Sequence, residues 1–469
     1  MSRFKPSSSS STSPSRWAAP PPGYEPAVAV ASASPVSTEQ AAREPERLDT
    51  AGEGGGSIAD FGFLVLCAYF VSGYISEWLL RLTGSSGYIA RALTILLPVM
   101  WILSPARFRG FRHFIGICWL GFAAWLIIDV PFSAWRGGSF DLLENYLPRS
   151  YMIFFFVAAL AVNVRRCRQL TYLGVAGAAI TLFSVIKFGV SDGERLRVPG
   201  SLFYGNSNDL ALGLLLGITQ FTFLFYREGV IKKAFATVCI GVSVIYMLRT
   251  GSRGCMLASA AYVVLIFILS RKKLLVLGVA VVAAAIGFAA LPSNTLQRLM
   301  LLGVDQNMEE TTTDIGARDS RLERTALIYR SLKETAKHPL FGLGPGQFAV
   351  AVAGEAKKNG EWSAWVGTHN SYTQVSSECG LPAFFCYCAV IVLCFKLSYQ
   401  VFRATRDNPA YSDINGMSFV LLSGIFVYAI ATFFFHMAYS GNLPTLSGLA
   451  LALYLAVKPL LPASQRRSI

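Results

Sequence analysis

Residues 381–399 read LPAFFCYCAVIVLCFKLSY, an apolar run of the length that an α-helix needs to cross a bilayer. Lys396 is the one charged residue within it. Similar runs recur along most of the chain, so that hydrophobic residues make up 53% of the sequence and charged residues only 14%. A soluble domain carries nearer a quarter charged residues, so this composition predicts lipid as the main solvent of the protein.

The apolar runs follow one another closely, which predicts an all-α polytopic membrane protein of about twelve transmembrane helices with one large loop between the ninth and the tenth. A few of the runs fall short of the ~20 residues of a full span, so their bounds are approximate. The predicted spans are 61–80, 88–103, 114–132, 151–164, 170–190, 208–226, 234–248, 255–270, 274–291, 381–399, 417–439 and 443–461.

The chain is expected to divide into four parts. Residues 1–57 are rich in Ser, Pro, Ala and Gly, and this composition predicts a disordered tail without the apolar core of a cleaved signal peptide. Residues 58–291 hold spans one to nine, and residues 292–378 form the large loop with short helices. Residues 379–469 hold the last three spans and a C-terminal tail.

Basic residues mark every second connection between the predicted spans. By the positive-inside rule these connections are cytoplasmic, and so are both termini. The large loop and the segments 195–209 and 248–257 then share the outer face. The basic clusters are Arg107/Arg109/Arg112, Arg165/Arg166/Arg168, Arg227/Lys232/Lys233, Arg271/Lys272/Lys273 and Arg403/Arg406.

The formal net charge of +14 indicates anionic partners. No basic helix or aromatic-basic platform accompanies the charge, so we expect no nucleic-acid partner, and membrane lipid head groups or phosphate-bearing substrates fit better. The nine cysteines include no CxxC pair or zinc spacing, and the outer segments contain no DxD pair. We therefore expect no metal and no cofactor.

The outer-face segments contain arginine, histidine and asparagine close to membrane depth, where polar side chains are costly and usually functional. The segment 195–209 reads RLRVPGSLFYGNSND, with Arg195, Arg197, Asn206 and Asn208. The turn 248–257 contains Arg253, and the exit of the large loop, THNSYTQVSSECG at 368–380, contains His369 and Asn370. Arginines that reach the lipid head groups and asparagines that cap helices are the alternative interpretations.

Three of these elements form a recognisable set. Arg253 and Leu257 give Arg-x-x-x-Leu, residues 338–348 read HPLFGLGPGQF, and His369 begins a His-Asn-x9-Gly element that ends at Gly380. With about twelve spans and a large periplasmic loop, the chain resembles the O-antigen ligase and O-antigen polymerase superfamily of membrane glycosyltransferases, which act in lipopolysaccharide or exopolysaccharide assembly. The usual Gly, Thr or Tyr three residues after the last glycine is Ala383 here.

The resemblance implies a glycan donor on undecaprenyl diphosphate and a lipid-anchored or glycan acceptor, such as lipid A-core. It also implies an active site on the periplasmic face of a bacterial inner membrane. Diphosphate needs fixed cations, and arginine forks suit its oxygens. The expected catalytic arginines are Arg253 and Arg197.

Further substrate contacts are expected from Arg195 and from an arginine of the set Arg318, Arg321 and Arg324; the family spacing favours Arg324 and the local sequence Arg321. A sugar hydroxyl is a weak acid that needs a base, and His369 is the candidate. The remaining candidates for substrate binding are His338, Asn206, Asn208 and Asn370.

The leading hypothesis is an O-antigen ligase-like, inverting, metal-independent glycosyltransferase. A repeat-unit polymerase would use the same donor and the same residues. A polysaccharide flippase or transporter also fits about twelve spans, although the sequence lacks the paired, Gly/Pro-broken half-repeats of many carriers.

Overall fold

In a computed structural model, the described residues are helical almost throughout, with one two-stranded ribbon, which confirms the all-α class of the prediction. Most of the predicted tail 1–57, most of the predicted span 274–291 and the first part of the large loop lie outside the described residues. The structure describes residues 48–50, 56–84, 87–192, 195–201, 204–271, 273, 274, 276–278, 281, 285, 312–358, 360 and 366–461.

Most of the helices follow the apolar runs in order. Those of the first part are α2 (Gly56–Tyr74), α3 (Ser76–Thr83), α4 (Gly87–Leu103), α5 (Phe114–Asp129), α6 (Arg136–Tyr146), α7 (Ile153–Leu160) and α8 (Val164–Phe188). The ribbon of β1 (Val190–Asp192) and β2 (Arg195–Arg197) follows α8. Then come α9 (Ser207–Phe221), α10 (Val230–Arg249), α11 (Arg253–Leu269), α14 (Thr312–Lys337), α15 (Phe348–Lys358), α16 (Ser371–Thr405), α17 (Ser412–Ala431) and α18 (Asn442–Val457).

Fewer helices than predicted are long enough to cross a membrane. Seven described helices pass by length and composition, or eight if α2 and α3, which meet at an angle of 65°, form one span. The apolar helices α4 and α11 have only 17 residues each. The predicted span 151–164 contains α7, which has eight residues and follows a π-helical turn at Leu147–Tyr151. The chain is an integral membrane protein with several helical spans; the count of about twelve is not confirmed.

The helix α16 lies at the centre of the packing. It contacts α5, α17 and α18, and it contacts α14 near its beginning, where the Thr335 and Ser376 hydroxyls are 2.9 Å apart. Close backbone approach also holds α18 to α7, since a Cβ atom on Gly448 would lie 3.1 Å from the carbonyl oxygen of Phe154. Small residues at such crossings are typical of helix packing in membranes.

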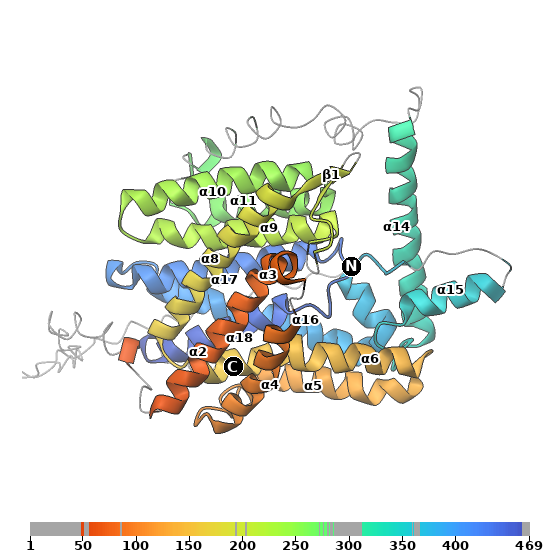
Figure 1. The fold of residues 1–469 in the computed structure, drawn as a ribbon, viewed down its shortest axis with the longest axis horizontal. Coiled ribbons are helices and arrows are strands. Elements are labelled where there is room, and N and C mark those ends of the chain that lie inside the picture. The colour runs from red at the N-terminus through yellow and green to blue at the C-terminus, as the bar shows by residue number, and fades with distance from the viewer. Residues whose placement is uncertain are drawn as a thin grey trace, which may run out of the picture. The chain divides into compact units, whose positions relative to one another are not determined.

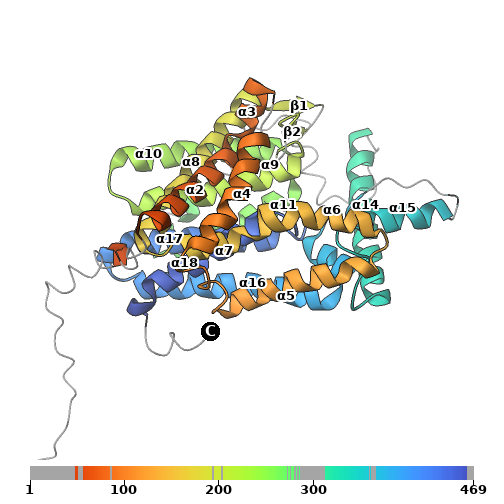
Figure 2. The same cartoon turned by 60° about the horizontal axis from the view of Figure 1, so that its bottom comes forward.

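The elements predicted to share the outer face lie at one end of the membrane helices. The β1–β2 ribbon, α14 and α15 are at the right of Figures 1 and 2, whereas the connection from α9 to α10 is at the left of Figure 1. Residues far apart in the sequence can therefore meet at the right-hand end.

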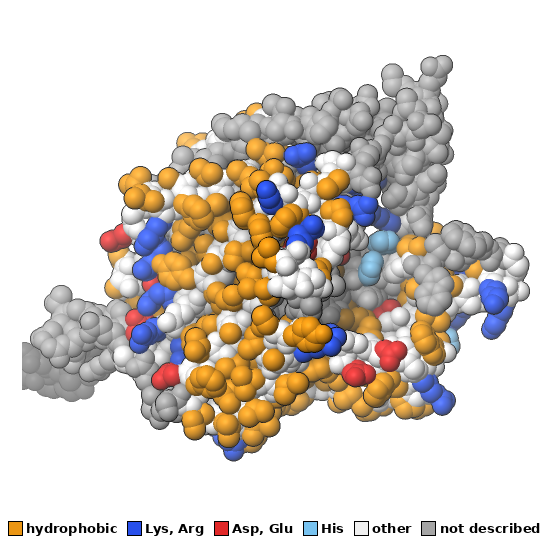
Figure 3. Space-filling model, viewed as in Figure 1, with side chains coloured by type: hydrophobic (Ala, Val, Ile, Leu, Met, Phe, Trp, Pro, Cys, Tyr) orange, Lys and Arg blue, Asp and Glu red, His pale blue; other side chains and the backbone are white. Residues whose placement is uncertain are grey.

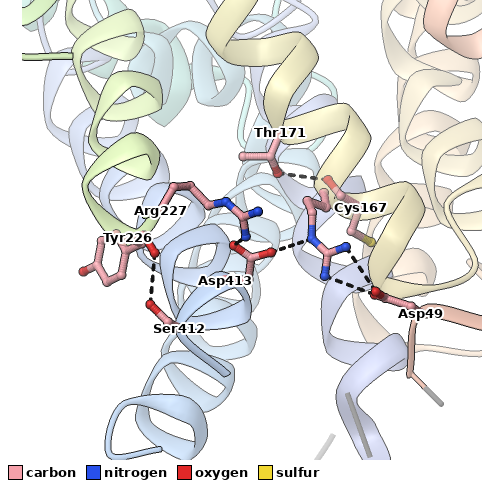
Figure 4. Close-up of polar contacts among 8 residues, drawn as sticks. Asp49, Cys167, Thr171, Tyr226, Arg227, Ser412 and Asp413 are labelled. Atoms are coloured by element: carbon pink, nitrogen blue, oxygen red, sulfur yellow. Dashed lines mark hydrogen bonds and ion pairs between the residues drawn. The ribbon is translucent and has the colours of Figure 1, made fainter. Parts of the chain in front are cut away.

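A network of ion pairs links α8, the segment between α9 and α10, and the start of α17 (Figure 4). Asp413 pairs with Arg168 at 2.6 Å and also with Arg227. Arg168 donates two further hydrogen bonds of 3.1 Å to Asp49, and the neighbouring Leu48 is buried. The end of the predicted tail thus packs against the helices through charge pairing.

The alternating basic loops predict which end faces outward. In a variant without its nine cysteines, a cysteine placed at the exposed position Lys358 should react with a membrane-impermeant thiol reagent in intact cells. A cysteine at the exposed position Asn408 should react only after the inner membrane is opened. The reverse pattern of labelling would contradict the predicted orientation.

Candidate active site

The β1–β2 ribbon presents two arginines on one face. Leu196 is buried between them, and since side chains alternate along a strand, Arg195 and Arg197 point to the same side. The Arg195 guanidinium donates hydrogen bonds to the Thr250 carbonyl oxygen at 2.9 Å and to Asn208 Oδ1 at 2.8 Å. These contacts join the ribbon to the start of α9 and to the turn between α10 and α11.

Arg253 is the first residue of α11, where backbone N–H groups have no partner in the preceding turn. Among the described residues, Ser252 donates or accepts no side-chain capping hydrogen bond at this helix start. Gly254 packs so closely that a Cβ atom there would lie 2.5 Å from Phe434 Cβ. The start of α11, with its positive dipole end and an arginine, therefore lies against the segment that follows α17.

His369 lies two residues before the start of α16, next to the capping Asn370, and faces a second histidine. Its ring centroid is 5.1 Å from that of His436, with the two rings edge to face. Gly367 packs on the His436 ring, since a Cβ there would lie 3.1 Å from His436 Cγ. Figure 3 shows histidine side chains at the surface close to Lys and Arg side chains.

The backbone of His369 is unusual as well. Among the described residues it is the one non-glycine residue with a positive φ, 51°. Such conformations are held in place by their surroundings and are enriched at functional sites. The conformation therefore agrees with a functional role for this histidine.

Together with burial, the positive charge of Arg324 lowers the pKa of His369. Burial, His436 and Arg324 together lower the pKa of His369 to about 4, so that its imidazole is neutral at physiological pH. Arg324 lies in α14, which therefore brings a cation close to the histidine pair. Arg318 and Arg321 lie in the same helix, with their side chains outside the described part.

The segment 338–348 crosses α16 where that helix is broken. Gly380 has φ 74° and ψ −179°, and a Cβ there would lie 1.9 Å from the Leu340 carbonyl oxygen. A Cβ on Gly342 would lie 2.4 Å from the backbone carbon of Glu378. Both glycines are needed for this close crossing. Ala383, the departure from the family pattern, is fully buried in the same region.

Glu378 stabilises this crossing through hydrogen bonds. It was not among the predicted site residues. It is 4% exposed and accepts hydrogen bonds from the Tyr439 hydroxyl at 2.8 Å and from the Gly346 N–H at 3.0 Å. The Gly344 N–H donates to its carbonyl oxygen at 2.7 Å. Its signal in the sequence is a carboxylate two residues before Gly380, at the border between the polar stretch 368–378 and the apolar run 381–399.

Three candidates make contacts within their own segments of the chain. Asn206 and Asn370 accept backbone N–H groups at the starts of α9 and α16, as helix caps do. His338 is half exposed at the end of α14, with Nε2 4.0 Å from Glu334. It lies about 20 Å along α14 from Arg324 at 1.5 Å per residue.

The structure thus brings together candidates from distant segments. Gly254, the neighbour of Arg253, packs against Phe434. His436, two residues after Phe434, packs against His369. Sequence reasoning did not select His436, because a lone histidine at the end of an apolar run is more often a packing residue.

One comparison with known proteins gave a match. The family model described as O-antigen ligase matches residues 235–388, from within α10 to within α16. The match includes Arg253, the segment 338–348 and His369. A search of curated proteins gave no match.

Proposed function

We propose that the chain is an inverting glycosyltransferase of the ligase type, because the family model described as O-antigen ligase matches its residues 235–388. It moves a glycan from undecaprenyl diphosphate to a sugar hydroxyl of lipid A-core or a similar acceptor. The reaction takes place on the periplasmic face of the inner membrane. The observation that carries this proposal is the meeting of His369, His436 and Arg324 at the end of the helices where α11 begins with Arg253.

The donor diphosphate is held by cations and by a helix start. Arg253 and the first N–H groups of α11 offer charge and hydrogen bonds to the phosphate oxygens. Arg195 positions the turn before α11 through its bond to the Thr250 carbonyl. Arg197, on the same face of the ribbon, adds a second fork for the diphosphate.

The transfer itself is a single displacement. His369 takes the proton of the acceptor hydroxyl while that oxygen forms a bond to the anomeric carbon of the donor. The bond from this carbon to the phosphate oxygen breaks, and undecaprenyl diphosphate leaves from the opposite side with the electron pair. The anomeric configuration is inverted, and no metal ion takes part.

The pH profile follows from the low pKa of His369. The imidazole accepts a proton only when neutral, so kcat/KM should be constant above this pKa and fall as the pH drops through about 4. Bound diphosphate stabilises the imidazolium and so raises the pKa of His369 in the complex. The fall of kcat on the acidic side should therefore occur at a higher pH than the fall of kcat/KM. Arg324→Gln removes a cation and should move the limb of kcat/KM upward. An unchanged limb in this variant would mean that another group is the base.

The proposal is tested with purified protein, lipid-linked donor and chelator. Glycan should be transferred in EDTA, and only after lipid-anchored core is added. A ladder of lengthening chains on the carrier without core would identify a polymerase, which is the alternative function. Loss of turnover in EDTA that Mg²⁺ restores would contradict the metal-independent mechanism, and donor movement across vesicles without transfer would identify a flippase.

A further inference from the structure

A pocket of about 150 Å³ lies between α14 and α15, away from the residues assigned to transfer. Glu334, Lys337, Ala351, Val352 and Glu355 line it. Val352 and Glu334 are buried, whereas the side chains of Lys337 and Glu355 are 42% and 49% exposed. The pocket is therefore closed at its base and open at its rim. Its volume equals that of about five waters in the liquid, which suits one small ring and no lipid chain.

The pocket has both a polar wall and an apolar base. Glu334 is 7% exposed, with Oε1 bonded to Lys337 at 2.7 Å and Oε2 4.0 Å from His338. A carboxylate offers about four acceptor positions, so Glu334 can also accept from hydroxyl groups. Ala351 and Val352 supply the apolar surface. This combination suits a sugar ring, which has hydroxyls at its edge and C–H groups on its face.

The charges around the pocket favour an uncharged ring. Glu355 pairs with Arg330 at 2.6 Å, and Glu334 pairs with Lys337, so two carboxylates face two cations. The local field is close to neutral, which gives little attraction for a phosphate or a uronate. Arg330 also donates to the Val352 carbonyl oxygen, and this bond holds α15 against α14.

The base of the pocket is fixed by packing. Leu327 of α14 packs with Leu343, Phe348 and Val352 in a small cluster under the pocket. The pocket walls are thus preformed, and binding there needs little ordering of the protein.

The helix α14 connects this pocket with the transfer residues. Arg324, Leu327, Ser331 and Glu334 recur at spacings of three and four, so they share one face of the helix. Glu334 lies about 15 Å along α14 from Arg324. This is a length that a few linked sugars span, so a glycan whose reacting end is at His369 can reach the pocket.

We propose that the α14–α15 pocket binds one neutral sugar of the transferred or receiving glycan, several units from the reacting bond. This inference rests on the proposed function. The pocket binds the glycan itself, whereas the arginines that bind the diphosphate, Arg253 and Arg197, contact only the carrier end. It would thereby favour chains long enough to reach it.

The test measures binding without transfer. The probes are oligosaccharides released by mild acid from the lipid-linked donor and, separately, from the core acceptor, titrated into protein in nanodiscs. Ala351→Phe fills the pocket and should weaken binding of at least one of them about tenfold or more, the effect of one or two lost contacts. Glu334→Gln keeps the shape and should weaken the same binding several-fold. Lys358→Phe, an exposed change on α15, is the matched control.

Unchanged binding of both probes in Ala351→Phe, or equal losses in Lys358→Phe, would overturn the proposal. The probe that loses affinity identifies the glycan as donor or acceptor. Arg253→Ala should bind the released glycans as the wild type does but transfer poorly. Full transfer by that variant would contradict the proposed mechanism and leave the pocket assignment standing.

Discussion

Replacing His369 with Asn should lower kcat for glycan transfer by ~10²–10⁴-fold, the usual contribution of a general base. Asparagine tolerates the positive φ of 51° at this position, so the variant removes the base without adding backbone strain. The measurement is single-turnover transfer from purified lipid-linked donor to core. Thermal unfolding in detergent should be close to that of the wild type, because the ring lies at the surface end of α16.

His338→Asn is the matched control, since His338 is a half-exposed histidine of the same loop, at the far end of α14. It should retain most of the activity. If His369→Asn kept half of the wild-type rate, the base would have to be another group, and His436 would be the next to replace.

Arg253→Ala should reduce kcat/KM by on the order of 100-fold. Two charge-assisted hydrogen bonds to a phosphate contribute about 3 kcal/mol, and their loss also leaves developing charge on the leaving diphosphate without a partner. Arg253→Lys keeps the charge but not the planar fork, so it should recover only part of the activity. Steady-state transfer at varied donor concentration separates the effect on kcat from that on KM.

Arg249→Ala is the control for this substitution. Arg249 is the last residue of α10, four positions earlier, and it donates a 3.5 Å hydrogen bond to Ser191 and lies over the Tyr246 ring. Its replacement should change kcat/KM little. Equal losses in the two variants would indicate a general effect of positive charge at this end of the helices rather than a specific clamp.

Composition and hydropathy predicted the solvent and the class of this protein correctly. Apolar runs such as 114–132 and 208–226 form helices with nearly the predicted bounds. In lipid the backbone N–H and C=O groups must be hydrogen-bonded within the segment, and a helix satisfies this requirement. The elements around Arg253, 338–348 and His369 also predicted the superfamily that the comparison supports.

Hydropathy was less informative about whether an apolar run forms one continuous helix. The run 151–164 contains only the short α7 after a π-helical turn with Pro148, and the first apolar run bends by 65° between α2 and α3. An apolar residue is buried from water equally well in a straight span, a bent span or a short buried helix. Hydropathy therefore does not distinguish these geometries.

The sequence by itself determined the membrane environment, the helices and the residue types at the candidate site. Only the tertiary structure decided that His436 faces His369, that the charge of Arg324 reaches this pair, and that Glu378 holds the segment 338–348 across Gly380. These partners are separated by about 30 to 70 positions in the chain. Periodicity and motifs report on neighbours within a few residues, whereas contacts between helices depend on packing that no local pattern encodes.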